Sequence, residues 1–174
     1  MLNFNKIIDT DDLYTVFRLC IMSKFVQGNA RYRECADNTE FRYESDDPTI
    51  NAYANKEGNR YTVTLLRGIL MWNGLFGLIW VLADNGQKFS DTLKMVHWAS
   101  NYLQNDFDGE IPETIYEDMI NGCGVSNPKK IIDSFNQGKL EQWRSSTLEI
   151  ARSVLAHELG HVCLGHVDDS GYDG

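Results

Sequence analysis

Apolar residues recur at helical spacing over much of this 174-residue chain, beginning near its N-terminus. Apolar side chains follow one another every third or fourth position from Leu13 to Phe25. Thr10-Asp11-Asp12 is suited to cap this helix, and Gly28-Asn29 to end it. Residues 30–50 are polar and charged, which predicts a surface loop or a short helix.

The pattern changes between residues 50 and 66. Arg60–Leu66 is rich in β-branched and aromatic residues, and polar residues around Gly58 separate it from Ile50–Ala54. This arrangement predicts a β-hairpin. Residues 69–83 then contain no charge, but they fall short of the ~20 residues that a membrane-spanning helix needs. A buried core helix over Gly68–Ala83 is therefore expected.

Further helices are expected in the second half of the chain. Pro112 suits the first turn of a helix that runs through Met119, and Asn127-Pro128 opens another. Ser90 can cap a helix whose inward side chains are predicted to be Leu93, Val96, Ala99, Tyr102 and Leu103. Together these elements predict an α+β fold, mostly helical with a small hairpin or sheet, in one domain over residues 1–174.

The last predicted helix has the strongest signals. Ser146 and Glu149 match a capping box, and Gly165 is a plausible C-terminal stop about five turns later. Its apolar face consists of Leu148, Ala151, Val154, Leu155, Leu159 and Val162.

The net charge, the N-terminus and the cysteines each argue for or against certain classes of protein. The net charge of −9 argues against non-specific binding to nucleic acid and against an anionic membrane surface. The N-terminus lacks the basic and apolar segments of a signal peptide. The cysteines are widely spaced, which favours free thiols in a cytoplasmic protein, with one or two disulfides as the alternative. They are Cys20, Cys35, Cys123 and Cys163.

The sequence His157-Glu158-Leu159-Gly160-His161 reads H-E-x-x-H. On a helix the two histidines lie one turn apart on the same face and can share a Zn²⁺ ion at about 2.0–2.1 Å. Glu158 stands beside them and can act as general base toward a zinc-activated water. The spacing therefore predicts a zinc site with His157 and His161 as ligands and Glu158 as the catalytic residue.

A catalytic zinc normally takes three protein ligands, and the third is open. His166 follows His157 by nine residues, about 900° of helical rotation, so a continuous helix would turn it to the opposite face. It could bind the metal only if the helix breaks, as Gly165 allows; otherwise it packs or forms a hydrogen bond at the helix end. Asp168 and Asp169 are the other candidates, whereas Cys163 faces away and is expected in the core.

Residues 155–166, Leu-Ala-His-Glu-Leu-Gly-His-Val-Cys-Leu-Gly-His, resemble the zincin metallopeptidases. The spacing is similar to gluzincin groups: the HtpX/CAAX-protease family, the ImmA/IrrE family and the Lit-type phage-exclusion peptidases. In those groups the last histidine is generally not a ligand, and a glutamate on a later helix is. The resemblance implies that this ligand lies beyond Gly174 in a truncated chain, or that His166, an aspartate or another subunit completes the site.

A second set of residues is similar to a segment of the HtpX-type proteases, in which a strand flanks the active-site cleft. It comprises Ile50–Ala54, Tyr61–Thr64 and Arg67–Leu70. The strand Tyr61–Leu66 is then either an edge that pairs with extended substrate or an internal strand.

Three functions remain in order of preference. The first is a cytoplasmic zinc endopeptidase acting on a protein or peptide, for which the resemblance implies a part in phage defence. The second is a non-catalytic, protease-like binding module with an incomplete zinc site. The third, a DNA-linked regulator of the ImmA/IrrE type, ranks low because no helix-turn-helix with a basic recognition helix is evident.

Overall fold

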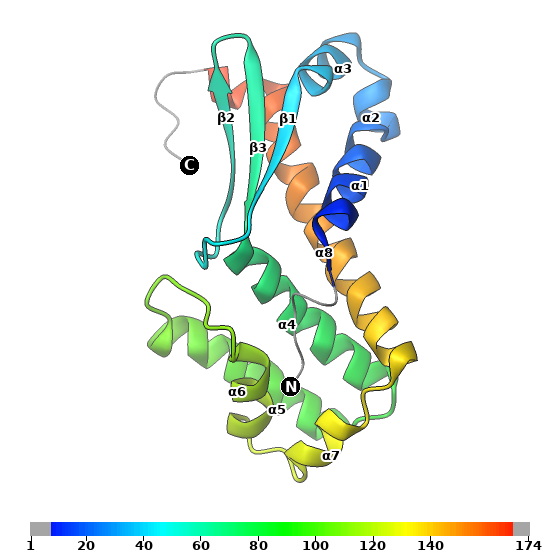
Figure 1. The fold of residues 1–174 in the computed structure, drawn as a ribbon, viewed down its shortest axis with the longest axis vertical. Helices are drawn as coiled ribbons and strands as arrows, with labels where there is room; N and C mark the ends of the chain where they lie inside the picture. The colour runs from blue at the N-terminus through cyan, green and yellow to red at the C-terminus, as the bar shows by residue number, and fades with distance from the viewer. Residues whose placement is uncertain (1–7, 169–174) are drawn as a thin grey trace.

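A computed structural model describes residues 8–168, in which helices surround and extend a small mixed sheet (Figure 1). This is the α+β class that the sequence predicts. The elements are α1 (Thr10–Ile21), α2 (Lys24–Gln27), α3 (Ala30–Asp37), β1 (Thr39–Glu44), β2 (Ala52–Glu57), β3 (Arg60–Leu66), α4 (Arg67–Asp84), α5 (Phe89–Asn101), the π-helical η2 (Tyr102–Asp106), α6 (Ile115–Gly122), α7 (Pro128–Asp133), α8 (Gln137–Leu164) and the 3₁₀ turn η3 (His166–Asp168).

The sheet has the strand order β1-β3-β2, so β3 is its central strand. Val63 of β3 pairs with Phe41 in parallel β1 and with Ala54 in antiparallel β2. The β2–β3 hairpin is confirmed, with Gly58 at φ +63° in its turn. The prediction of Tyr61–Leu66 as a substrate-pairing edge is wrong, because both sides of β3 are already hydrogen-bonded; the alternative of an internal strand is confirmed.

Residues 30–50 contain more structure than a loop or a short helix. They form α3 and the edge strand β1. Phe41 of β1 is buried, whereas its neighbours Glu40 and Arg42 are exposed. This alternation is a strand signal, but the charged residues on the outer face conceal it in a segment with so few apolar positions.

Four helix starts differ from the sequence prediction. α5 starts at Phe89, so Ser90 lies inside the helix instead of capping it. α1 is capped by Asp9, which forms a capping box with Asp12. α6 starts at Ile115, after Pro112. α8 begins at Gln137, because the Asn136 side chain accepts the Lys139 N–H (3.0 Å), so the Ser146–Glu149 capping box is wrong. By contrast, Asn127 caps α7 ahead of Pro128 as predicted, and α4 closely matches the expected core helix.

α5 turns a different face to the core from the one predicted. Leu93 is 51% exposed, and Val96 and Leu103 are also exposed, whereas Ala99 is buried as predicted. The buried positions are Asp91, Met95 and Ala99, four residues apart. Gln87 and Lys94 donate hydrogen bonds to the Asp91 carboxylate at 2.8 and 3.4 Å. These partners allow a charged residue to occupy a core-facing position, which an apolar periodicity cannot predict.

α8 connects the two ends of this elongated molecule (Figure 1). α8 packs along α4 and also contacts α1, α3, β2 and β3. The buried apolar residues form one hydrophobic cluster that extends through both halves. Within residues 8–168, none of the helices combines the length and apolarity that spanning a bilayer requires. The four cysteines are free thiols, as expected.

Gly68 sits at the junction between the sheet and α4, where the chain passes very close to itself. A Cβ atom there would lie 2.0 Å from the carbonyl oxygen of Pro48 and 2.2 Å from that of Thr49, both backbone atoms that cannot simply rotate away. We expect Gly68→Ala to lower the free energy of unfolding by about 1–3 kcal/mol in urea denaturation.

Gly160→Ala is the matched control, because a Cβ at this position in α8 meets nothing within 4 Å. Removing an interior helical glycine should stabilise the protein by about 0.5–1 kcal/mol. Equal stability of Gly68→Ala and wild type would show that the 45–51 loop yields and that close approach at Gly68 is not required.

Candidate metal centre at the end of α8

His157 and His161 lie one turn apart near the C-terminal end of α8. Their Nε2 atoms are 3.1 Å apart, and their rings are perpendicular with centroids 4.6 Å apart. Two nitrogens bound to one tetrahedral zinc at about 2.0–2.1 Å are themselves about 3.3–3.4 Å apart. The two Nε2 atoms therefore already have nearly the separation that a shared metal ion requires.

The surroundings of His161 favour the neutral form of its ring. His157 is exposed and His161 is half-buried. Burial lowers the pKa of His161, and positive charge on His157 or His166 would lower it further. Since a metal binds the unprotonated imidazole nitrogen, this environment suits His161 as a ligand.

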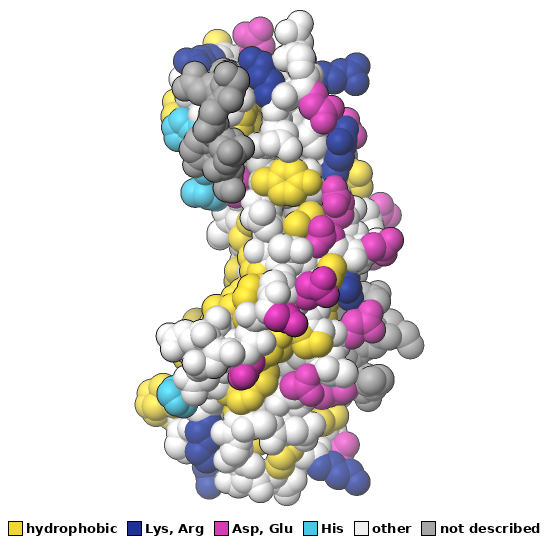
Figure 2. Space-filling model, turned by 90° about the vertical axis from the view of Figure 1, so that its left-hand side faces the viewer, with side chains coloured by type: hydrophobic (Ala, Val, Ile, Leu, Met, Phe, Trp, Pro, Cys, Tyr) yellow, Lys and Arg dark blue, Asp and Glu magenta, His cyan; other side chains and the backbone are white. Residues whose placement is uncertain are grey.

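Glu158 follows His157 directly and is half-buried. Burial raises the pKa of its carboxyl group, and the neighbouring His157 partly offsets this effect. The helix is held in place by Leu155, Leu159 and Val162, which are buried in the core on another face. The apolar positions thus anchor α8 so that the two histidines stand at the surface, where Figure 2 shows histidine side chains at this end of the molecule.

The helix breaks at Gly165, which adopts φ +80° and ends α8. The chain then enters η3, and His166 comes back beside the site: its Nδ1 lies 2.9 Å from Nδ1 of His161. The break that the sequence analysis required for His166 to approach is therefore present. The break brings the third histidine to the pair although a continuous helix would have placed it on the opposite face.

His166 meets a different nitrogen of His161 from the one that faces His157. In the part of the chain that the structure describes, no group of three or more His, Cys, Asp or Glu side chains is arranged to hold a metal ion. His166 as third ligand stays a prediction. Asp169 and the side chain of Asp168 lie outside the described residues. Cys163 is buried as expected, and burial raises its pKa to about 11, which disfavours a metal-binding thiolate.

The strand beside the site is β2 rather than β3. β2 contacts both α8 and η3, and β3 occupies only one of its two sides. The sequence left Tyr61–Leu66 open as an edge or an internal strand, and the edge is excluded because β1, which has a weak sequence pattern, pairs with β3 on its other side. With β1 on the far side of β3, the strand edge that pairs with no other strand among residues 8–168, on the strand that contacts α8 and η3, belongs to β2. We call this edge the free edge of β2.

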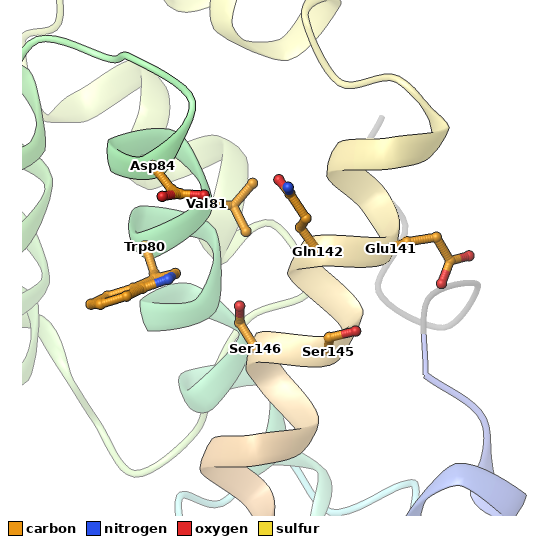
Figure 3. A pocket seen from close by; sticks show the side chains of 7 residues that line it. All are labelled: Trp80, Val81, Asp84, Glu141, Gln142, Ser145 and Ser146. Atoms are coloured by element: carbon orange, nitrogen blue, oxygen red, sulfur yellow. The ribbon is translucent and has the colours of Figure 1, made fainter.

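A cavity of about 320 Å³ lies between α4 and α8, farther back along α8 (Figure 3). Trp80, which the sequence places in a buried helix, is 70% exposed at its rim. Ser146, which also lines the cavity, precedes His157 by eleven residues. The two residues therefore lie on nearly the same face of α8, about 16 Å apart along its axis. The other residues lining the cavity are Val81, Asp84, Glu141, Gln142 and Ser145.

Comparisons with known proteins identify no relative: no protein-family model matches the chain, and neither the curated proteins nor the solved structures show a significant match. The assignment of a function therefore depends on the chemistry of His157, Glu158 and His161 and on the contacts around them.

Proposed function

We propose that this protein is a zinc-dependent endopeptidase that hydrolyses peptide bonds of a protein substrate. The observation that carries this proposal is the 3.1 Å separation of the Nε2 atoms of His157 and His161 on one turn of α8. Glu158 follows the first of them and supplies a half-buried carboxylate. Two neutral imidazoles and an adjacent carboxylate are the groups that this hydrolysis needs.

Each residue has a distinct part in the proposed reaction. His157 and His161 would hold the zinc ion, which when bound supplies Lewis-acid chemistry by polarising a carbonyl and lowering the pKa of water. Glu158 takes a proton from the attacking water and passes it to the leaving amine. Partial burial makes its carboxylate a stronger base than one in bulk water.

The free edge of β2 is the proposed place for the substrate backbone. An extended peptide can add to an exposed sheet edge through main-chain hydrogen bonds. Ala52, Tyr53 and Ala54 of β2 are half-buried, whereas Asn55, Lys56 and Glu57 are exposed. The edge is thus anchored at one end and accessible at the other, and β2 also contacts the elements that carry the histidines.

We place this activity in the cytoplasm, because the four cysteines are free thiols rather than disulfides. The resemblance of residues 155–166 to Lit-type and ImmA/IrrE-type peptidases favours a role in phage defence.

A non-catalytic binding module is the second candidate. It is favoured by one observation: the described residues provide two facing imidazoles but no arranged group of three metal-binding side chains. A two-histidine site would bind zinc weakly, and the protein would then function by binding a partner protein rather than by hydrolysis.

The zinc content of the purified protein tests the proposed metal centre. We expect protein prepared without chelator to bind about one zinc ion per chain and to cleave an unstructured protein substrate, with activity lost on chelation and restored by zinc. The double substitution His157→Ala with His161→Ala should abolish both properties. His97→Ala is the control, because His97 is an exposed histidine on α5. Wild-type protein that takes up no zinc, or a double variant that retains it, would refute the proposed centre.

A further inference from the structure

We propose that His166 is a positioning residue that orients His161 from behind. In this arrangement, His161 donates its Nδ1–H to Nδ1 of His166 and directs its unprotonated Nε2 toward the metal position beside His157. This inference rests on the proposed function, because the metal gives the orientation its purpose. It assigns to His166 a role distinct from that of third ligand.

The three rings form a chain of contacts through both nitrogens of His161. Nε2 of His157 lies 3.1 Å from Nε2 of His161, and Nδ1 of His161 lies 2.9 Å from Nδ1 of His166. A neutral imidazole carries one donor and one acceptor nitrogen, so the central ring donates on one side and accepts on the other. The two hydrogen bonds must therefore point in the same direction along the chain.

Only one direction is compatible with metal binding by His161. If His166 donates to His161, then Nε2 of His161 carries the proton and cannot bind a metal. If His161 donates to His166, then Nε2 of His161 is unprotonated and accepts a hydrogen bond from Nε2–H of His157. For His157 to bind a metal as well, its proton would move through solvent from Nε2 to Nδ1, while the His161 tautomer stays the same. Metal-binding histidines usually donate their second ring N–H to a fixed acceptor, which fixes tautomer and ring orientation.

The backbone holds the acceptor in place. Gly165 ends α8 in the left-handed conformation, with its N–H 3.1 Å from the carbonyl oxygen of Val162. The η3 turn that follows contacts both α8 and β2, and Val167 packs against the hydrophobic core. The position of His166 is thus set by the end of the helix and by core packing, before any metal binds.

The same geometry argues against His166 as a direct ligand. Its Nδ1 faces Nδ1 of His161, while the Nε2 of His161 that faces His157 lies across the ring. A metal shared by His157 and His161 would sit on the Nε2 side. His166 would have to leave its present contact to reach that position.

Two substitutions at one position test this role. His166→Asn keeps an oxygen acceptor near the place of Nδ1, whereas His166→Ala removes it. In metal-free protein, ¹⁵N NMR of the imidazole rings should find the His161 proton on Nδ1 in wild type and in His166→Asn, and a shift toward Nε2–H in His166→Ala. Chelator competition should then show about 10–100-fold weaker zinc binding in His166→Ala, largely restored in His166→Asn.

The alternatives give different results. A direct ligand would make both substitutions lose zinc affinity alike, and X-ray absorption would show one nitrogen fewer around the metal; this overturns the proposal. Unchanged zinc affinity in His166→Ala, or a proton on Nε2 of His161 in wild type, overturns it as well. Wild type that binds no zinc would refute the proposed function and the metal-directed role together, while the NMR measurement separately decides whether the hydrogen bond exists.

Discussion

Replacing Glu158 with Gln is expected to lower the rate of peptide hydrolysis by about 10²–10⁴-fold while zinc remains bound. The amide keeps nearly the size and shape of the carboxylate but cannot accept the proton of the attacking water. His157 and His161, which would hold the metal, are unchanged. The measurement is kcat/KM on a protein substrate, together with the zinc content of the same sample.

Glu149→Gln is the matched control for this substitution. Glu149 is an exposed residue of the same helix, and its pairing with Arg152 at 3.8 Å is a surface ion pair that contributes little to stability. Activity should stay at the wild-type level in this variant. Full activity in Glu158→Gln would exclude Glu158 as the base, and a biological effect that survives loss of hydrolysis would favour the non-catalytic module.

Loss of activity in Glu158→Gln should not come from unfolding. Burial raises the pKa of Glu158, which means that the folded state disfavours the charged carboxylate relative to the unfolded chain. Above that pKa the charge therefore costs stability, and the cost disappears as the pH falls and the group is protonated. At neutral pH we expect the uncharged variant to melt at the same temperature as wild type or slightly higher.

Trp143→Ala should have the largest effect on stability, lowering the free energy of unfolding by about 3–5 kcal/mol. Trp143 is fully buried in α8, and its ring packs edge-on against Tyr116 of α6 at a centroid distance of 5.0 Å. Its Nε1–H donates to the carbonyl oxygen of Gly74 in α4 (2.7 Å). The substitution would leave a large cavity where three helices meet, measurable by urea denaturation.

Trp80→Ala is the matched control, because it removes the same side chain from a site that is 70% exposed. Its effect should stay within about 0.5 kcal/mol. Trp143→Phe isolates the hydrogen bond: it keeps most of the ring and should cost clearly less than alanine. Similar losses at positions 80 and 143 would mean that α4, α6 and α8 do not pack through Trp143 as described.

The candidate site was predictable from sequence to the extent that its chemistry is local. His157 and His161 are four residues apart on one helix, so their spacing alone places them on the same face, and Glu158 directly follows the first of them. The position of His166 was not, because it depends on the conformation of a single residue. A continuous helix would carry His166 to the face opposite His157 and His161. The left-handed conformation of Gly165 ends the helix instead and brings His166 back beside His161.

The same distinction applies to the fold: elements with a strong local sequence pattern were predicted, and the others were not. The β2–β3 hairpin and α4 have strong local patterns, and the sequence locates both. The start of α8 was missed, because a plausible capping box at Ser146 and Glu149 lies inside a longer helix that Asn136 begins. The strand β1 depends on its pairing with β3, in which Phe41 lies opposite Val63. The buried face of α5 includes Asp91, a charged residue that an apolar pattern does not mark, and Gln87 and Lys94 satisfy its carboxylate.

The packing of α1 against α8 also has a consequence for the order of folding. Asp12 accepts a hydrogen bond from Nε of Arg144 at 3.1 Å, and the Cys20 thiol donates to the carbonyl oxygen of Arg152 at 3.6 Å; each contact closes a loop of 132 residues. Closing so long a loop is entropically costly, so these contacts should form late, after the hairpin and α4. α8 reaches its final position against the hairpin only in that last step, and the proposed zinc affinity should therefore be acquired late in refolding.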